Sequence, residues 1–198
     1  MSMTCPNFIT HYFTSEHGPF SNILEAIERD PGLVGRINER SAIIHARFLH
    51  PLYLPCRVET ERRLREVFQA KGGKVTDAHP VYFTLGDSSF LESKTDHRYR
   101  RKVRIPISVL ETECMSFTYV DSMTMIHLRA NRESASTIRP HYEDVYTHEE
   151  FQDVIRKLGY YDDRWVTDST IHFDTYIEVQ YWNRGHLTDD RQRYFVWM

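Results

Sequence analysis

The alternation of apolar and polar residues along the chain predicts strands at several separate places. Runs rich in β-branched and aromatic residues, bounded by Gly, Pro, Asp or Ser, are typical of strands. They cover residues 8–14, 81–85, 102–109, 115–120, 124–128, 171–182 and 193–197. In the run 171–182, Glu178 and Gln180 are two residues apart, so their side chains point to the same face of a strand.

Other stretches repeat apolar residues every three or four positions, which is typical of amphipathic helices. They cover about 21–29, 59–71 and 147–158. The third has the clearest boundaries, because Thr147 and Glu150 form a capping box and Gly159 ends the pattern. Pro51 and Pro55 predict a loop before the second helix.

The order of these elements predicts the fold class. Strands and helices do not alternate in regular βαβ units, so an α+β fold is favoured over a doubly wound parallel sheet. A length of 198 residues suits one domain, 1–198, and no linker divides it. We therefore expect a single domain in which helices flank a sheet.

Composition and cysteine usage indicate the cellular setting. With 40% hydrophobic and 27% charged residues, the chain has no apolar run long enough to cross a bilayer and no signal-peptide pattern. Cys5, Cys56 and Cys114 are widely spaced and form no CxxC pair. These features favour a reduced, cytoplasmic protein without a membrane partner.

Common catalytic and metal-binding motifs are absent from the sequence. It contains no phosphate-binding glycine loop, nucleophile elbow, HExxH helix or EF-hand loop. None of the pairs His11/His17, His45/His50 and His141/His148 has the four-residue spacing that places two ligands on one helix face. We expect no metal site and no reactive cysteine, since nothing in the sequence lowers the pKa of a particular thiol.

Charge is unevenly distributed, although the net charge is only −3. One basic cluster contains Arg98, Arg100, Arg101, Lys102 and Arg104, with Tyr99 among them. A second contains Arg57, Arg62, Arg63 and Arg65. Mixed basic and aromatic surfaces suit single-stranded nucleic acid, whose phosphates pair with cations while bases stack. The alternative is a solvated loop and a solvated helix face.

Three segments together resemble a known enzyme pattern. They are His11-Tyr12-Phe13-Thr14 followed by Phe20-Ser21-Asn22-Ile23-Leu24, then Val81-Tyr82-Phe83-Thr84, and finally Ile177-Glu178-Val179-Gln180. In this order they resemble the ADP-ribosyltransferase fold, and most of all its small bacterial DarT-like toxin and phage-defence members. The chain departs from the usual pattern in that Tyr12 occupies the position where a histidine normally precedes the aromatic residue and threonine.

The resemblance implies a single α+β domain with a mixed or antiparallel sheet, and NAD as substrate. It implies that Glu178 stabilises the oxocarbenium-like state formed when nicotinamide leaves, and that Gln180 positions the ribose or the acceptor. The residues implied to hold NAD are His11, Tyr12, Thr14, Tyr82, Phe83 and an arginine among Arg36, Arg40 and Arg47, with Arg47 as the candidate. Nucleic acid is the favoured acceptor, and an antitoxin or chaperone protein is the implied partner.

Several alternatives remain open from the sequence. His11 and Glu178 could form a general acid–base pair if the fold brings them together. The acceptor could be a protein side chain. The chain could instead be a non-enzymatic binding module with a basic face, or a hydrolase that depends on a divalent metal rather than on NAD.

Overall fold

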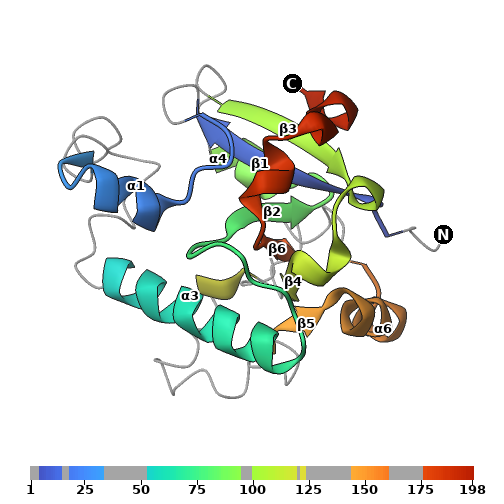
Figure 1. Ribbon diagram of the computed structural model, residues 1–198. Helices are drawn as coiled ribbons and strands as arrows, with labels where there is room; N and C mark the ends of the chain where they lie inside the picture. The colour runs from blue at the N-terminus through green and yellow to red at the C-terminus, as the bar shows by residue number, and fades with distance from the viewer. Residues whose placement is uncertain are drawn as a thin grey trace.

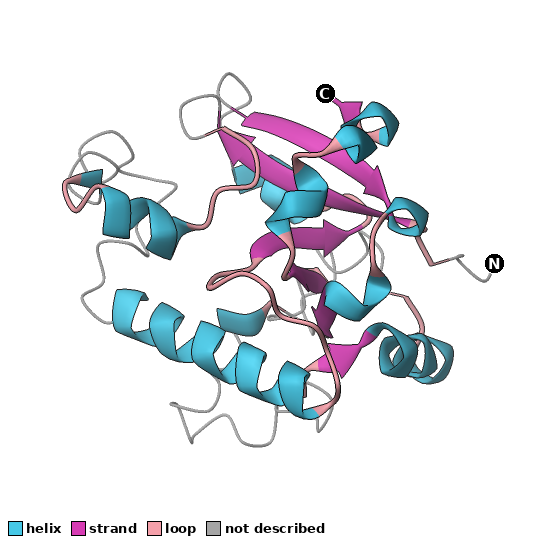
Figure 2. Ribbon diagram, in the orientation of Figure 1, coloured by secondary structure: helices cyan, strands magenta, loops and turns pink. Residues whose placement is uncertain are grey.

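One antiparallel sheet forms the centre of the molecule. The computed structural model describes residues 5–14, 18–33, 53–94, 100–119, 121–123, 144–160 and 176–198. The strands of this part pair in the order β5-β4-β6-β2-β1-β3-β7 (Figures 1 and 2). Their bounds are β1 Phe8–Thr14, β2 Val81–Leu85, β3 Arg100–Pro106, β4 Met115–Thr118, β5 Tyr146–Thr147, β6 Glu178–Tyr181 and β7 Val196–Trp197. The predicted α+β class is confirmed.

The helices differ in how clearly the sequence marks their ends. They are α1 (Ile23–Arg29), α3 (Tyr53–Ala70), α4 (Ser89–Lys94) and α6 (His148–Leu158), with short 3-10 turns at Ile107–Val109, Thr112–Cys114, Arg184–Leu187 and Asp190–Tyr194. Asn22 caps α1 by accepting from the backbone N–H of Leu24. Thr147 and Glu150 form the predicted capping box on α6, and Gly159 ends that helix.

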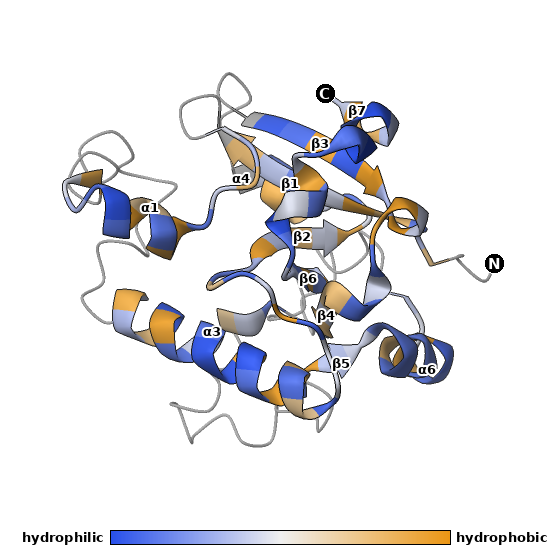
Figure 3. Cartoon of the chain, viewed as in Figure 1, coloured by the Kyte–Doolittle hydropathy of each residue, from blue (hydrophilic) through white to orange (hydrophobic). Residues whose placement is uncertain are grey.

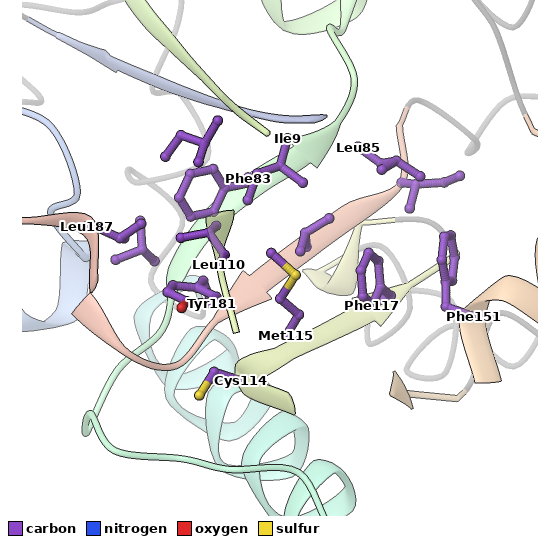
Figure 4. Packing of buried hydrophobic residues seen from close by; sticks show 14 of the residues in the cluster. Ile9, Phe83, Leu85, Leu110, Cys114, Met115, Phe117, Phe151, Tyr181 and Leu187 are labelled. Atoms are coloured by element: carbon purple, nitrogen blue, oxygen red, sulfur yellow. The ribbon is translucent and has the colours of Figure 1, made fainter. Parts of the chain in front are cut away.

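The two faces of the sheet have different characters. One face is apolar and forms the main core, to which Ile9, Phe83 and Leu85 of the adjacent strands β1 and β2 belong (Figure 4). On this face α6 packs against β4, since the rings of Phe151 and Phe117 stack 4.4 Å apart.

The other face is covered in part by α3. A smaller cluster joins Leu64 and Phe68 of this helix to Trp182, which directly follows β6. Figure 3 shows hydrophobic and hydrophilic residues alternating along α3, as expected for a helix with one packed and one solvated side. Helix α3 therefore packs on the polar face of β6 and β2.

Some predicted boundaries were wrong. Helix α3 begins at Tyr53 rather than at residue 59, with Pro55 inside its first turn. A proline is tolerated there because the first backbone N–H groups of a helix have no partner within it. The strand predicted over 102–109 ends at Pro106, and the strand predicted over 193–197 is limited to Val196–Trp197. The strand predicted at 124–128 lies outside the described residues.

Candidate active site

Cross-strand pairing aligns polar side chains along one face of the sheet. Glu178 of β6 lies between Thr118 of β4 and Thr84 of β2, and Thr84 in turn pairs with Thr10 of β1. All four have exposed fractions of 5% or less. Burying such groups carries a desolvation cost unless hydrogen bonds replace the lost water. A polar row across four strands therefore distinguishes this face from the apolar one.

A second polar row lies two residues along the strands. Gln180 pairs with Ser116 on one side and Tyr82 on the other. Ser116 Oγ donates to Gln180 Oε1 at 2.8 Å, and Gln180 Nε2 donates to Glu178 Oε1 at 2.9 Å. The expectation that Glu178 and Gln180 share a face of their strand is confirmed.

Glu178 is a buried carboxylate with an uneven set of partners. Gln180 Nε2 and Ser122 Oγ both donate to Oε1, at 2.9 and 2.6 Å, while no described residue donates to Oε2. Burial raises the pKa of Glu178, Arg57 opposes that rise, and Asp121 adds to it, so the pKa lies above its ordinary value. Oε1 is therefore fixed by two donors, whereas Oε2 has no donor within the described part of the chain.

Arg57 of α3 provides the positive charge beside this carboxylate. Its guanidinium carbon lies 3.8 Å above the centre of the Tyr82 ring, and its Nε donates to Glu61 Oε1 at 3.1 Å. Nη1 and Nη2 have no hydrogen-bond partner in the part of the chain that the structure describes. Burial lowers the pKa of Arg57, but the acidic groups of Tyr82, Glu178 and Glu61 together raise it, so it stays charged.

Glu61 fixes the orientation of Arg57. Its Oε1 accepts from Arg57 Nε at 3.1 Å, from Asn22 Nδ2 at 2.9 Å and from the Tyr82 hydroxyl at 3.1 Å. Its Oε2 lies 2.7 Å from His79 Nδ1. Four partners on two oxygens tie the start of α1, helix α3 and strand β2 together around the guanidinium.

Sequence reasoning missed Arg57 as a site residue and placed it in a basic cluster, interpreted either as a surface for phosphates or as a solvated helix face. The signal was present, however. Arg57, Glu61, Leu64 and Phe68 follow the i, i+4, i+7, i+11 spacing of one helix face, and all four are buried. A cation and a carboxylate within an otherwise apolar stripe would have identified the pair, had the helix been predicted to start before residue 59.

The structure separates the residues that the resemblance grouped together. Tyr82 lies beside Gln180 on the polar face, but His11 and Phe83 point to the apolar face, where their ring centres lie 5.3 Å apart. His11 is held by Tyr82 O and by the backbone N–H of Phe20, at 2.8 and 3.0 Å. Burial lowers the pKa of His11 to about 4, so it is a neutral core residue. His11 and Glu178 therefore do not form a general acid–base pair.

Tyr12 shares the polar face but belongs to a neighbouring network. Its hydroxyl donates to Glu92 Oε1 at 3.3 Å and accepts from the backbone N–H of Ser88 at 2.8 Å. The side chain of Thr14 is not among those described, and Arg47 lies outside the described residues. Of the positions implied to hold NAD, Tyr82 is the one next to Gln180.

The predicted basic clusters are largely neutralised where the structure describes them. Lys102 Nζ pairs with Asp87 and Glu92 at 3.1 and 2.6 Å, and Arg104 pairs with Asp87. Arg101 is exposed, whereas Arg98 and the side chain of Arg100 are not described. In the second cluster, Arg57 is buried and Arg62 pairs with both Glu59 and Glu66. These pairs reduce the positive potential that the sequence predicted.

Comparison with protein-family models, curated proteins and solved structures finds no match for this chain. Among the described residues, no group of His, Cys, Asp and Glu is arranged to hold a metal ion. No helix of this part is long and apolar enough to cross a membrane.

The arrangement is suited to a ligand that carries both charges. Oε2 of Glu178, which has no donor among the residues that the structure describes, can face a developing or permanent positive charge. The Nη groups of Arg57 can bind an anion in a bidentate manner. Both lie on a buried face, where charges interact more strongly than in water. Such a site can bind and polarise a ligand of mixed charge.

Proposed function

We propose that the chain is an NAD-dependent mono-ADP-ribosyltransferase in which Glu178 is the catalytic carboxylate. The observation that carries this proposal is the buried Glu178 carboxylate, which Gln180 and Ser122 hold through one oxygen and whose pKa, raised by burial, is lowered in part by the nearby charge of the Arg57 guanidinium. The proposal is also supported by topology, since the parts His11–Thr14, Val81–Thr84 and Glu178–Gln180 of the resemblance lie on the adjacent strands β1, β2 and β6. They are far apart in the sequence, so their adjacency is not a consequence of chain continuity.

The charges of NAD fit those of the site. NAD carries a cationic nicotinamide ring and an anionic pyrophosphate, joined through riboses. Arg57 would hold the pyrophosphate through its Nη1 and Nη2 groups, which have no hydrogen-bond partner among the described residues, and would replace Arg47 as the candidate for this contact. Tyr82 would support Arg57 from below rather than stack on nicotinamide, because the guanidinium already covers its ring.

The carboxylate supplies the electrostatic part of the reaction. NAD supplies an activated bond between ribose and nicotinamide, and positive charge develops on the ribose as this bond breaks. Oε2 of Glu178 stabilises that charge, while Gln180 and Ser122 hold the carboxylate so that it need not reorganise. The same oxygen can take the proton of the attacking acceptor group. Losing one such preorganised charge ordinarily lowers the rate by roughly 10²–10³-fold.

For the acceptor we propose nucleic acid, as the segment from Arg98 to Arg104 suggested. This part of the proposal rests on composition alone, because Lys102 and Arg104 are ion-paired. A toxin or phage-defence effector of this kind would need a neutralising protein, so an antitoxin or chaperone belongs to the proposal as a partner.

The test is transfer of label from NAD labelled in its adenylate phosphate to single-stranded DNA, RNA or the proteins of a cell lysate. We expect wild type to label nucleic acid and Glu178→Gln to lose at least about a hundredfold in rate. This variant keeps an oxygen for Ser122 and Gln180, so it should fold normally. Labelling of protein instead would correct the acceptor, and equal labelling by both proteins would contradict the function of Glu178.

A further inference from the structure

A chain of buried hydrogen bonds leads from Trp182 to Glu178. Trp182 Nε1 donates to Ser116 Oγ at 2.9 Å, and Ser116 Oγ donates to Gln180 Oε1 at 2.8 Å. Gln180 Nε2 then donates to Glu178 Oε1 at 2.9 Å. Trp182, Ser116 and Gln180 have exposed fractions of 0%, so these bonds are shielded from bulk solvent.

The donors and acceptors of this hydrogen-bonded chain have a fixed direction. An indole N–H can only donate, so Ser116 Oγ must accept from Trp182 and has its single proton free for Gln180. The amide of Gln180 therefore turns its oxygen to Ser116 and its NH₂ group to Glu178. An ionised carboxylate can only accept, which requires the same orientation from the other end. Both ends of the chain agree on one arrangement of the amide.

Trp182 is itself held in place on several sides. Its backbone N–H donates to Cys114 O at 2.9 Å, and its carbonyl accepts from the hydroxyl of Thr76 at 2.6 Å. Its ring stacks on Phe68 of α3, with the ring centres 6.4 Å apart and the planes inclined by 21°. The first donor of the chain is thus anchored to the helix that carries Arg57.

We propose that Trp182 and Ser116 are positioning residues that act through Gln180 to fix the Glu178 carboxylate. This inference rests on the proposed function for its catalytic meaning. The inference also changes the role of Gln180. The resemblance implied that Gln180 positions the ribose or the acceptor, whereas here it orients Glu178. With Gln180 and Ser122 both donating to Oε1, the carboxylate cannot rotate without breaking two bonds, and Oε2 keeps its direction.

The experiment follows the ionisation of Glu178 directly. Protein labelled with ¹³C at the glutamate side-chain carboxyls is titrated by NMR, and the Glu178 signal is assigned by its loss in Glu178→Gln. In Ser116→Ala we expect the midpoint to rise by about half a pH unit or more, because the ionised form loses an oriented donor. Trp182→Phe should give a smaller rise, and adding it to Ser116→Ala should change nothing further.

Kinetics of nicotinamide release supply a second readout. For Ser116→Ala at neutral pH we expect kcat to fall roughly two- to tenfold, with little change in KM for NAD and partial recovery at higher pH. The matched control is Trp197→Phe, which removes an indole N–H from the exposed strand β7. It should leave both the titration and kcat unchanged.

The outcomes separate the two proposals. A Glu178 midpoint in folded Ser116→Ala equal to that of wild type would overturn the positioning chain. If Ser116→Ala does not fold, the midpoint in Trp182→Phe decides in the same way. Absence of nicotinamide release from wild type would overturn the proposed function instead, and the titration would still test the hydrogen-bonded chain.

Discussion

At the scale of single residues, the polar face holds two buried carboxylates with different surroundings. Glu61 has partners on both oxygens, from Arg57, Asn22, Tyr82 and His79. Among the described residues Glu178 has two donors, Gln180 and Ser122, both on Oε1. A carboxylate surrounded on both oxygens serves as a structural anchor, whereas one with an open oxygen can act on a ligand. These surroundings give Glu61 a structural role and agree with the catalytic role proposed for Glu178.

The raised pKa of Glu178 predicts how the stability of the folded protein depends on pH. The pKa of the Glu178 carboxyl is higher in the folded protein than in the unfolded one. The free energy of unfolding therefore falls as the pH rises from the ordinary pKa of the carboxyl through its raised pKa. Glu178→Gln removes this ionisation at nearly constant volume. We expect the variant to have a higher Tm than wild type at neutral pH, with the difference vanishing below about pH 4. Calorimetry across this pH range checks it, and a lower Tm at neutral pH would contradict the cause given for the shift.

A second prediction at this scale concerns the contact between Arg57 and the pyrophosphate of NAD. In Arg57→Lys the charge remains, but the planar fork that can bind a pyrophosphate through two parallel bonds is lost. We expect KM for NAD to rise roughly tenfold with a smaller change in kcat.

The matched control for Arg57→Lys is Arg62→Lys on the same helix, where the side chain is exposed and pairs with Glu59 and Glu66. It should leave KM unchanged, as exposed ion pairs contribute little. Equal effects of the two substitutions on KM would exclude Arg57 as the anion contact.

At the scale of elements, α3 joins the site to the rest of the fold. One of its faces carries Arg57 and Glu61 to the site, while Leu64 and Phe68 pack on Trp182. Its end is closely packed as well, because a Cβ on Gly73 would lie 2.4–2.5 Å from ring atoms of Phe68. Phe68 is fully buried, so its ring can move only by displacing its packed neighbours.

Gly73→Ala therefore tests how tightly the end of α3 is packed around Phe68. Displacing a buried ring in this way should cost roughly 1–3 kcal/mol in the free energy of unfolding. The neighbouring Lys74→Ala removes an exposed ion pair with Glu113 and should cost at most about 1 kcal/mol. Denaturant unfolding compares the two, and a Gly73→Ala variant as stable as Lys74→Ala would show that Phe68 is free to move.

Elements were predictable from sequence where the signal was local. The alternation over Phe8–Thr14 and Val81–Leu85 gave the bounds of β1 and β2, and the capping box gave the start of α6. The start of α3 was missed because Pro55 suggests a loop, although a proline suits a first helical turn equally well. The face of His11 was not predictable, since aromatic residues lie on both sides of β1.

At the scale of the whole molecule, the sheet order creates the site. Strands β1, β2 and β6 are separated by long stretches of sequence, yet they are neighbours in the sheet (Figure 1). Strand β4 completes the face by bringing Ser116 and Thr118 opposite Gln180 and Glu178. The period of a strand predicts which side chains share its face, but strand pairing depends on long-range contacts that one sequence does not reveal. The three segments were recognised from the sequence through the resemblance. The placement of Arg57 and Glu61 beside them, and the hydrogen-bonded chain, were recognised only from the fold.

The most direct measurement is nicotinamide release from NAD by purified wild-type protein and Glu178→Gln, at matched concentration and without any acceptor. Water can replace the acceptor, so the measurement does not depend on knowing the substrate. We predict slow release by wild type and a loss of at least about a hundredfold in Glu178→Gln, with the variant still folded. Release at the same rate by both proteins, or by neither, would contradict the assignment of Glu178 as the carboxylate of an NAD-consuming transferase.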